Sequence, residues 1–173
     1  MLALWVPLWG ALVAPVAPSA QAPDSALLRR YADAVYATAD TLDVLRGVTQ
    51  AFRNDLKTAS PTLVLARATS VQNACSSGVT AVRQLQGILA ARTVTPKSAP
   101  SQAKFRTAAE QTVAALERCV RNWQPLPRTD GRADTLRAWG PYRVNEIEVA
   151  LRRFDLARFT FAAAAGLPRR PVK

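Results

Sequence analysis

The 173-residue sequence predicts an all-α protein, an up-down-up-down antiparallel four-helix bundle. Apolar residues recur at helical spacing in four long segments, and proline and glycine mark the connections between them. No segment alternates apolar and polar residues as a half-buried strand does. A chain of this length fits one domain with a sizeable core. We expect that domain to span residues 24–167, between an apolar leader at residues 1–23 and an extended basic tail at residues 168–173.

The first predicted helix begins after Asp24 and Ser25, two residue types that cap helix N-termini, and ends near Ser60. Its apolar residues occupy two neighbouring heptad columns, so one face of the helix should be buried. The columns hold Leu28, Val35, Leu42 and Leu56, and Tyr31, Leu45 and Phe52.

The second predicted helix begins at Ser60 and Pro61, a capping residue followed by a proline at the first helical position. Its apolar positions alternate steps of four and three residues, the strongest periodicity in the chain. These positions are Val64, Ala68, Val71, Cys75, Gly78, Val82, Leu85 and Leu89. Residues 93–101, with Pro96 and Pro100, predict a connection.

The third predicted helix begins near Ser101 and stops before Pro125 and Pro127. Its inner face carries Phe105, Ala109, Leu116, Cys119 and Trp123.

The fourth long helix is predicted from about Tyr142, because Gly140 and Pro141 favour a break after a short helix that holds Leu136 and Trp139. Gly166 and Pro168 should end it. Its buried positions should be Val144, Ile147, Leu151, Phe154 and Phe161.

Cys75 and Cys119 are expected to form a disulfide. The midpoint of their numbers, 97, falls in the connection between the second and third helices, so both residues lie at the same height of a helical hairpin. Facing Cα atoms of neighbouring helices come within roughly 5 Å, which a disulfide can bridge. The alternative is two separate buried thiols. A lasting disulfide requires an oxidising compartment, so we expect the periplasmic or extracellular side of a bacterial membrane.

The leader, residues 1–23, has no charged side chain and resembles an export signal with small residues before a cleavage point. Pro23 and the missing positive side chain argue against simple cleavage. The alternative is a retained anchor, in which Trp5 and Trp9 would lie at the membrane interface.

Several chemistries are excluded by composition. The chain has no histidine, and Met1 is its one methionine, so histidine-based triads, histidine-ligated haem and most zinc catalysis are ruled out. The glycines form no phosphate-binding loop, and Asp40 and Asp43 have no partner cluster for a metal. We therefore expect a protein without catalytic activity, cofactor, metal or small-molecule substrate.

The net charge of +11, from 23 basic and 12 acidic residues, indicates an anionic partner. The most concentrated basic feature lies on the fourth helix and the tail; the alternative is that it forms only a solvated face. Its residues are Arg152, Arg153, Arg158, Arg169, Arg170 and Lys173. Nucleic acid is a weaker choice, because an exported protein rarely meets it.

These observations favour a structural or accessory subunit that is exported, associates with the membrane and docks on a larger membrane protein complex, of the electron-transfer or light-harvesting kind, or on anionic lipid headgroups. The alternative is a free periplasmic binding module or chaperone for anionic or unfolded clients.

Overall fold

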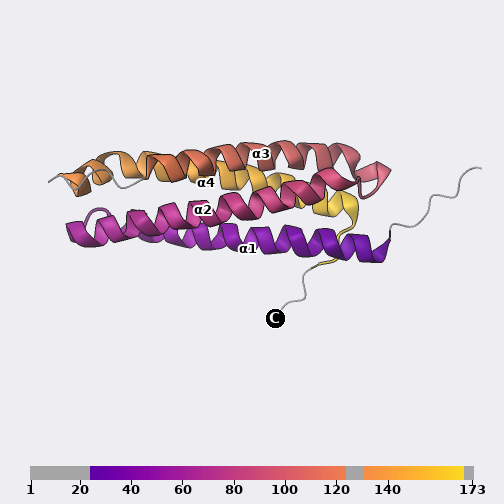
Figure 1. The fold of residues 1–173 in the computed structure, drawn as a ribbon, viewed down its shortest axis with the longest axis horizontal. Helices are drawn as coiled ribbons and strands as arrows, with labels where there is room; N and C mark the ends of the chain where they lie inside the picture. Colours follow the sequence, from indigo (N-terminus) through magenta and orange to yellow (C-terminus); the bar gives the residue numbers. More distant parts are fainter. Residues whose placement is uncertain (1–23, 124–130, 170–173) are drawn as a thin grey trace, which may run out of the picture.

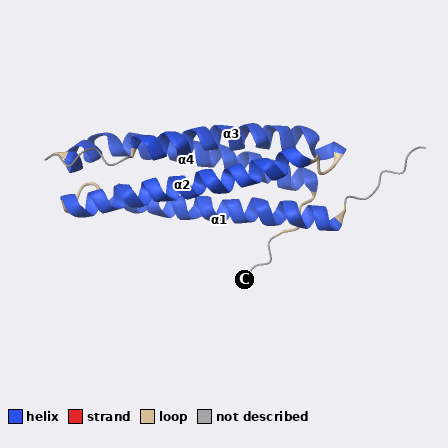
Figure 2. Ribbon diagram, viewed as in Figure 1, coloured by secondary structure: helices blue, strands red, loops and turns tan. Residues whose placement is uncertain are grey.

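The computed structural model describes residues 24–123 and 131–169, and within these ranges it is helical without a strand (Figure 2). The long helices lie side by side in an elongated bundle (Figure 1). In chain order the elements are α1 (Ser25–Asp55), α2 (Pro61–Ala91), the short 3-10 helix η1 (Pro96–Ser98), α3 (Ala99–Asn122) and α4 (Arg132–Ala165).

Each helix packs against the next one along the chain, and α1 also packs against α4. Side-chain contacts show which ends of α1 and α2 lie close together. Tyr31, near the start of α1, donates a hydrogen bond of 3.0 Å to the Ile88 carbonyl near the end of α2. Arg67, near the start of α2, bonds Asp55 at the end of α1 with an Nε–Oδ2 distance of 2.8 Å.

The ends of α1 and α4 are placed in the same way. Tyr36 donates to the Pro168 carbonyl beyond α4 at 3.0 Å, and Arg137 near the start of α4 donates to the Leu56 carbonyl beyond α1 at 3.0 Å. Consecutive helices therefore pack along their lengths and form one shared core.

The core consists of the predicted stripes. All eight positions of the second stripe are buried, as are the predicted positions of the third and fourth helices. The predicted positions of the first helix are buried too, except Leu28, which is partly buried. Aromatic rings pack at two levels. Trp123 contacts Phe52 and Trp139 with ring centroids 4.7 and 5.4 Å apart, and Phe105 contacts Phe154 at 5.1 Å.

The predicted helix ends agree with the local chemistry. The Asp24 carboxylate accepts a hydrogen bond from the Ala26 N–H at 2.9 Å, and the Ser60 hydroxyl accepts one from the Leu63 N–H at 3.3 Å. Gly166 ends α4 in the left-handed conformation at φ 65°, which glycine adopts without a steric penalty. Two ends differ from expectation, because α1 stops at Asp55 and α3 begins at Ala99.

The predicted break at Gly140 and Pro141 is wrong, because α4 is continuous from Arg132 to Ala165. Proline removes a single N–H from the helical ladder, and packing of the flanking turns compensates for that loss. Gly140 is present for another reason. A Cβ atom there would lie 2.9 Å from Phe52 Cε1, so the close approach of α1 to α4 leaves no room for a side chain.

Cys75 and Cys119 join α2 to α3, with Sγ atoms 2.06 Å apart and Cα atoms 6.2 Å apart. The predicted pairing of the two cysteines is confirmed. Both side chains are buried in the core, at 0% and 4% exposure.

Candidate functional site

Arg152 and Arg153, the central residues of the predicted basic patch, are both exposed on α4 but border different grooves. Arg152 lines a groove between α1 and α4, where it approaches Glu148 at 4.0 Å. Arg153 lines a second groove, between α3 and α4, together with Arg118. The side chains of these neighbouring arginines therefore border the two sides of one exposed ridge of α4.

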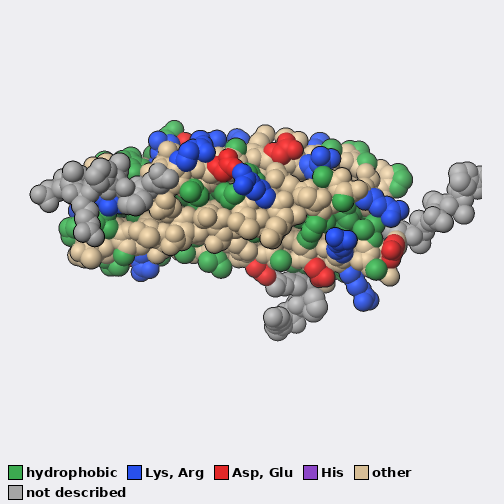
Figure 3. All heavy atoms as spheres, viewed as in Figure 1, with side chains coloured by type: hydrophobic (Ala, Val, Ile, Leu, Met, Phe, Trp, Pro, Cys, Tyr) green, Lys and Arg blue, Asp and Glu red, His purple; other side chains and the backbone are tan. Residues whose placement is uncertain are grey.

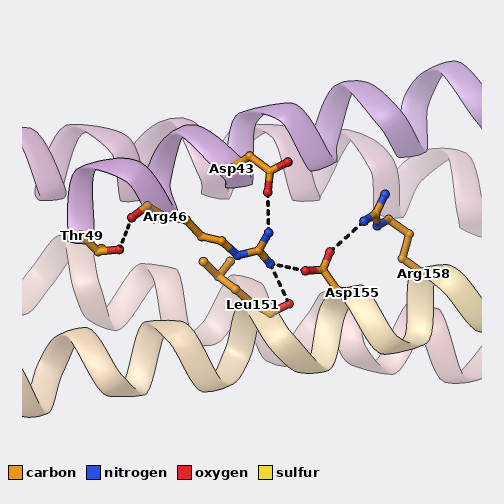
Figure 4. Close-up of polar contacts among 6 residues, drawn as sticks. All are labelled: Asp43, Arg46, Thr49, Leu151, Asp155 and Arg158. Atoms are coloured by element: carbon orange, nitrogen blue, oxygen red, sulfur yellow. Dashed lines mark hydrogen bonds and ion pairs between the residues drawn. The ribbon is translucent and has the colours of Figure 1, made fainter. Parts of the chain in front are cut away.

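Arg158 has a different environment, because its side chain is only 14% exposed. It pairs with Asp155 at 3.1 Å, and its guanidinium carbon lies 4.2 Å from the centroid of the Phe159 ring. Asp155 also binds Arg46 of α1, which in turn binds Asp43 and the Leu151 carbonyl (Figure 4). Arg158 thus belongs to the α1–α4 seam and not to the surface around Arg152 and Arg153.

The basic tail is described as far as Arg169. This residue lies in a groove beside Arg29, Asp33 and Tyr36 of α1, next to the bond between Tyr36 and the Pro168 carbonyl. Arg170 and Lys173 lie outside the described residues, as does the leader with Trp5 and Trp9.

Most acidic side chains are already neutralised. Among the described residues, seven carboxylates form ion pairs with arginine: Asp43, Asp55, Glu117, Asp134, Glu146, Glu148 and Asp155. Arg118 and Arg153 form no ion pair in this part of the chain. Figure 3 shows the basic side chains of one face spread over it rather than gathered in one block. In the described ranges, the excess positive charge is therefore distributed over separate cations such as Arg118 and Arg153.

The outward side of α4 is unusually apolar. Of the six large hydrophobic side chains exposed in the described part of the chain, four lie on α4: Tyr142 at 65%, Val149 at 38%, Leu156 at 72% and Phe159 at 60%. Tyr142, Val149 and Leu156 follow one another at steps of seven residues and so share a side of the helix. We call these four residues, with Arg152 and Arg153, the α4 outer face.

Sequence reasoning identified the two arginines of the α4 outer face but missed its apolar members. A signal was present, because Tyr142, Val149 and Leu156 form a second heptad column beside the buried one. Periodicity alone does not tell which of two columns faces the core.

The α3–α4 groove beside the outer face has a volume of about 410 Å³. Gln111 and Arg118 of α3 contribute polar groups to its lining, as do Asn145, Glu146 and Arg153 of α4. Ala114, Ala115 and Ala150 supply small apolar surfaces, and Tyr142 and Val149 of the outer face border it. The groove thus combines two separate cations and one carboxylate, which is already paired with Arg143, with an apolar lining.

Across residues 24–123 and 131–169, no group of three or more cysteine, aspartate or glutamate side chains could hold a metal ion. Over the same ranges no helix has the length and apolar character needed to cross a bilayer. Burial raises the pKa of Tyr31, but that residue belongs to the core between α1 and α2.

Comparison with known proteins gives no relative. No protein-family model matches the chain, and neither a curated protein nor a solved structure matches it with significant similarity.

Proposed function

We propose that this protein is a non-catalytic accessory subunit, exported and associated with the membrane, that docks through the α4 outer face onto a larger membrane protein complex. The observation that carries this proposal is the concentration on α4 of Tyr142, Val149, Leu156 and Phe159, exposed next to Arg152 and Arg153.

The composition of this face supports a protein interface. Aromatic side chains and arginine, here Tyr142, Phe159, Arg152 and Arg153, are enriched in the buried centres of protein interfaces. Exposed apolar side chains that gather on one helix favour association, because burying them in a partner removes their surface from water. Arginine flanks such a centre well, since its guanidinium group binds carboxylates with two parallel hydrogen bonds.

The scaffold for this role is, in our proposal, an up-down-up-down antiparallel bundle over residues 24–167. The contacts of Tyr31 with Ile88, Arg67 with Asp55 and Tyr36 with the Pro168 carbonyl support this topology. The Cys75–Cys119 bond supports export, because disulfides persist in oxidising compartments, here the periplasmic or extracellular side of a bacterial membrane.

The test is to isolate the tagged chain from native membranes under mild detergent and separate the material on native gels. We expect the chain to migrate with a larger complex. Leu156→Ser combined with Phe159→Ser should release it, whereas Val44→Ser should not. Val44 is a matched control, because it is 65% exposed and lies on α1. Recovery of the chain only as a free monomer contradicts the proposal.

The second candidate is a free periplasmic binding module or chaperone. It is favoured by the surface grooves of about 410, 430 and 470 Å³, volumes within the range of ligand sites. A mature chain without its leader that binds an anionic ligand or an unfolded client in calorimetric titration would support this candidate against the first.

A further inference from the structure

The α3–α4 groove is shaped by two parallel rows of side chains. On α4 its lining runs from Tyr142 to Arg153, which corresponds to about 16 Å, or three helical turns. On α3 it uses Gln111, Ala114 and Arg118, spaced as one face of a helix. Alanine in the lining lets another backbone approach closely. These dimensions match a further helix of about three turns lying between α3 and α4.

The two unpaired arginines lie at opposite ends of this groove. Arg118 shares a small cavity with Glu146 and Ile147, at the level of Cys119. Arg153 is next to Phe154, and Phe154 packs on Phe105 of α3. Phe105 lies more than three turns before Cys119 on α3, so Arg153 lies toward the other end of the groove. Because Glu146 and Arg153 are seven residues apart, the two cationic ends are separated by about 10 Å along α4.

Within the described part of the chain, neither end is neutralised by its surroundings. Glu146 is paired with Arg143 at 3.0 Å, so the group of Arg118, Arg143 and Glu146 keeps one net positive charge. Arg153 has Gln111 in the same groove and no ion-pair partner among residues 24–123 and 131–169. A complementary ligand therefore carries two negative charges about 10 Å apart with apolar surface between them.

We propose that the occupant of the α3–α4 groove is an amphipathic α-helix of a partner protein, with two acidic residues seven positions apart. This inference rests on the proposed docking function and specifies the partner's contact. Residues i and i+7 of a helix lie about 10 Å apart on one side, which matches the spacing of the cationic ends. Apolar residues between them would cover Ala114, Ala150 and Val149, as in other helix-in-groove complexes.

An anionic lipid surface fits the same features less well. A phospholipid headgroup concentrates its charge on one phosphate and is held by several cations that converge on it. Here the cations are separated by two helical turns, and a carboxylate lies at one end. The apolar lining between the cations suits a side-chain row and not a headgroup.

The binding test uses the full disulfide-bonded chain and synthetic helical peptides of about 18 residues with fluorescent labels. One peptide has two glutamates seven positions apart with leucine and alanine between them, and in the second peptide both glutamates are replaced by lysine. We expect fluorescence anisotropy to detect binding of the acidic peptide alone. Arg118→Gln and Arg153→Gln should each weaken this binding about tenfold, as expected for the loss of one charge-assisted contact.

Matched variants separate the groove from general charge and from folding. Arg121→Gln removes the same charge from an exposed site on α3 outside the groove and should change the affinity less than twofold. Ala114→Trp fills the groove from an exposed position and should abolish binding without changing the charge. A peptide in which lysine replaces the glutamate that faces Arg153 should bind the unmodified protein weakly. The Arg153→Glu variant should bind this peptide well, because the charges of the pair are exchanged. Urea unfolding of each variant verifies that the bundle is intact.

The results that overturn this inference are distinct from those that overturn the docking function. Absence of peptide binding contradicts the groove assignment. It is also contradicted if Arg121→Gln weakens peptide binding as much as Arg118→Gln and Arg153→Gln do. Binding to vesicles of phosphatidylglycerol and phosphatidylcholine that depends on Arg118 and Arg153, without peptide binding, assigns the groove to lipid instead. The native complex could survive Arg118→Gln and Arg153→Gln but be lost with the Leu156 and Phe159 changes. That result supports the docking function and contradicts the proposal that a partner helix occupies the groove. Absence of any native complex removes the docking function, whatever the peptides do.

Discussion

Gln102 is a buried polar residue that completes the end of α2. Its Oε1 accepts a hydrogen bond from the Val94 N–H at 3.1 Å, and its Nε2 donates to the Leu89 and Arg92 carbonyls at 2.9 and 2.8 Å. The last carbonyls of a helix have no partner within the helix, so this amide supplies what the ladder lacks. The Tyr31 hydroxyl lies against the Arg92 carbonyl as well and against that of Ile88, so it supports the same end of α2.

Replacing Gln102 with leucine should lower the free energy of unfolding by about 2 to 4 kcal/mol, because it leaves buried backbone groups unpaired at about 1 to 3 kcal/mol each. Urea denaturation followed by circular dichroism measures the loss. Gln84→Leu is the control, since Gln84 is exposed on α2, and its effect should stay within about 0.5 kcal/mol. Equal effects of both substitutions would show that the amide has no capping role.

Tyr31 should make the stability of the fold sensitive to alkali. Burial raises the pKa of its hydroxyl above the ordinary tyrosine value of about 10, so the folded state holds this proton more tightly than the unfolded state does. The corresponding stability is complete below pH 10 and falls as the pH rises above it. Tyr31→Phe should therefore show a shallower decline of unfolding free energy between pH 9 and 11 than the wild type, measured by urea denaturation. Parallel curves would contradict the assignment.

At the residue scale, apolar positions were predictable and buried polar ones were not. Every member of the second stripe is buried, because a regular spacing of four and three residues defines one side of a helix. The burial of Gln102 depends on three backbone groups of another segment, and no local pattern of its own helix indicates them.

At the element scale, α4 shows how packing overrides local preference. Glycine followed by proline is typical of a helix break, yet α4 continues through both residues because its two halves share one buried side against α1 and α3. Gly140 is required by the contact with Phe52, which is itself packed on Trp123. A position that the sequence marks as a break is instead a site of close helix packing.

Gly140→Ala should therefore destabilise the protein by about 1 to 3 kcal/mol, because the added methyl group must displace a packed ring. Gly87→Ala is the matched change on α2. A Cβ there meets no atom within 4 Å, so alanine should stabilise the helix by about 0.5 to 1 kcal/mol. Thermal unfolding of the two variants should shift in opposite directions; a rise for both would refute the packing role of Gly140.

The α1–α4 seam depends on Asp155, which is shared by Arg46 and Arg158 and is 22% exposed (Figure 4). Asp155→Asn should cost about 1 to 3 kcal/mol, because it leaves the largely buried Arg158 without its counterion and Arg46 with Asp43 alone. Asp134→Asn removes an exposed pair within α4 and should cost less than about 0.5 kcal/mol. Chemical denaturation compares the two, and an equal cost would show that the seam contributes no more than a surface pair.

At the scale of the whole molecule, the disulfide joins Cys75 and Cys119, which are 44 positions apart in the sequence, and so closes a long loop of the chain. Replacing both cysteines with alanine should reduce the unfolding free energy by about 4 kcal/mol in the chain-entropy estimate, because the unfolded chain regains its freedom. Urea midpoints measured with and without reductant should differ for the wild type and coincide for the double variant. A wild-type midpoint that does not respond to complete reduction would contradict this expectation.

The helical class, the four amphipathic segments, three of their caps and the cysteine pairing could all be derived from the order of the residues. The reason is that periodicity, capping and hairpin symmetry are properties of local spacing along the chain. Packing between helices governed the rest: the continuity of α4, the inward position of Arg158 beside the Arg46–Asp155 pair and the exposure of Tyr142, Val149 and Leu156. A helix with two apolar columns can bury either one, and its neighbours determine which column remains at the surface to meet a partner.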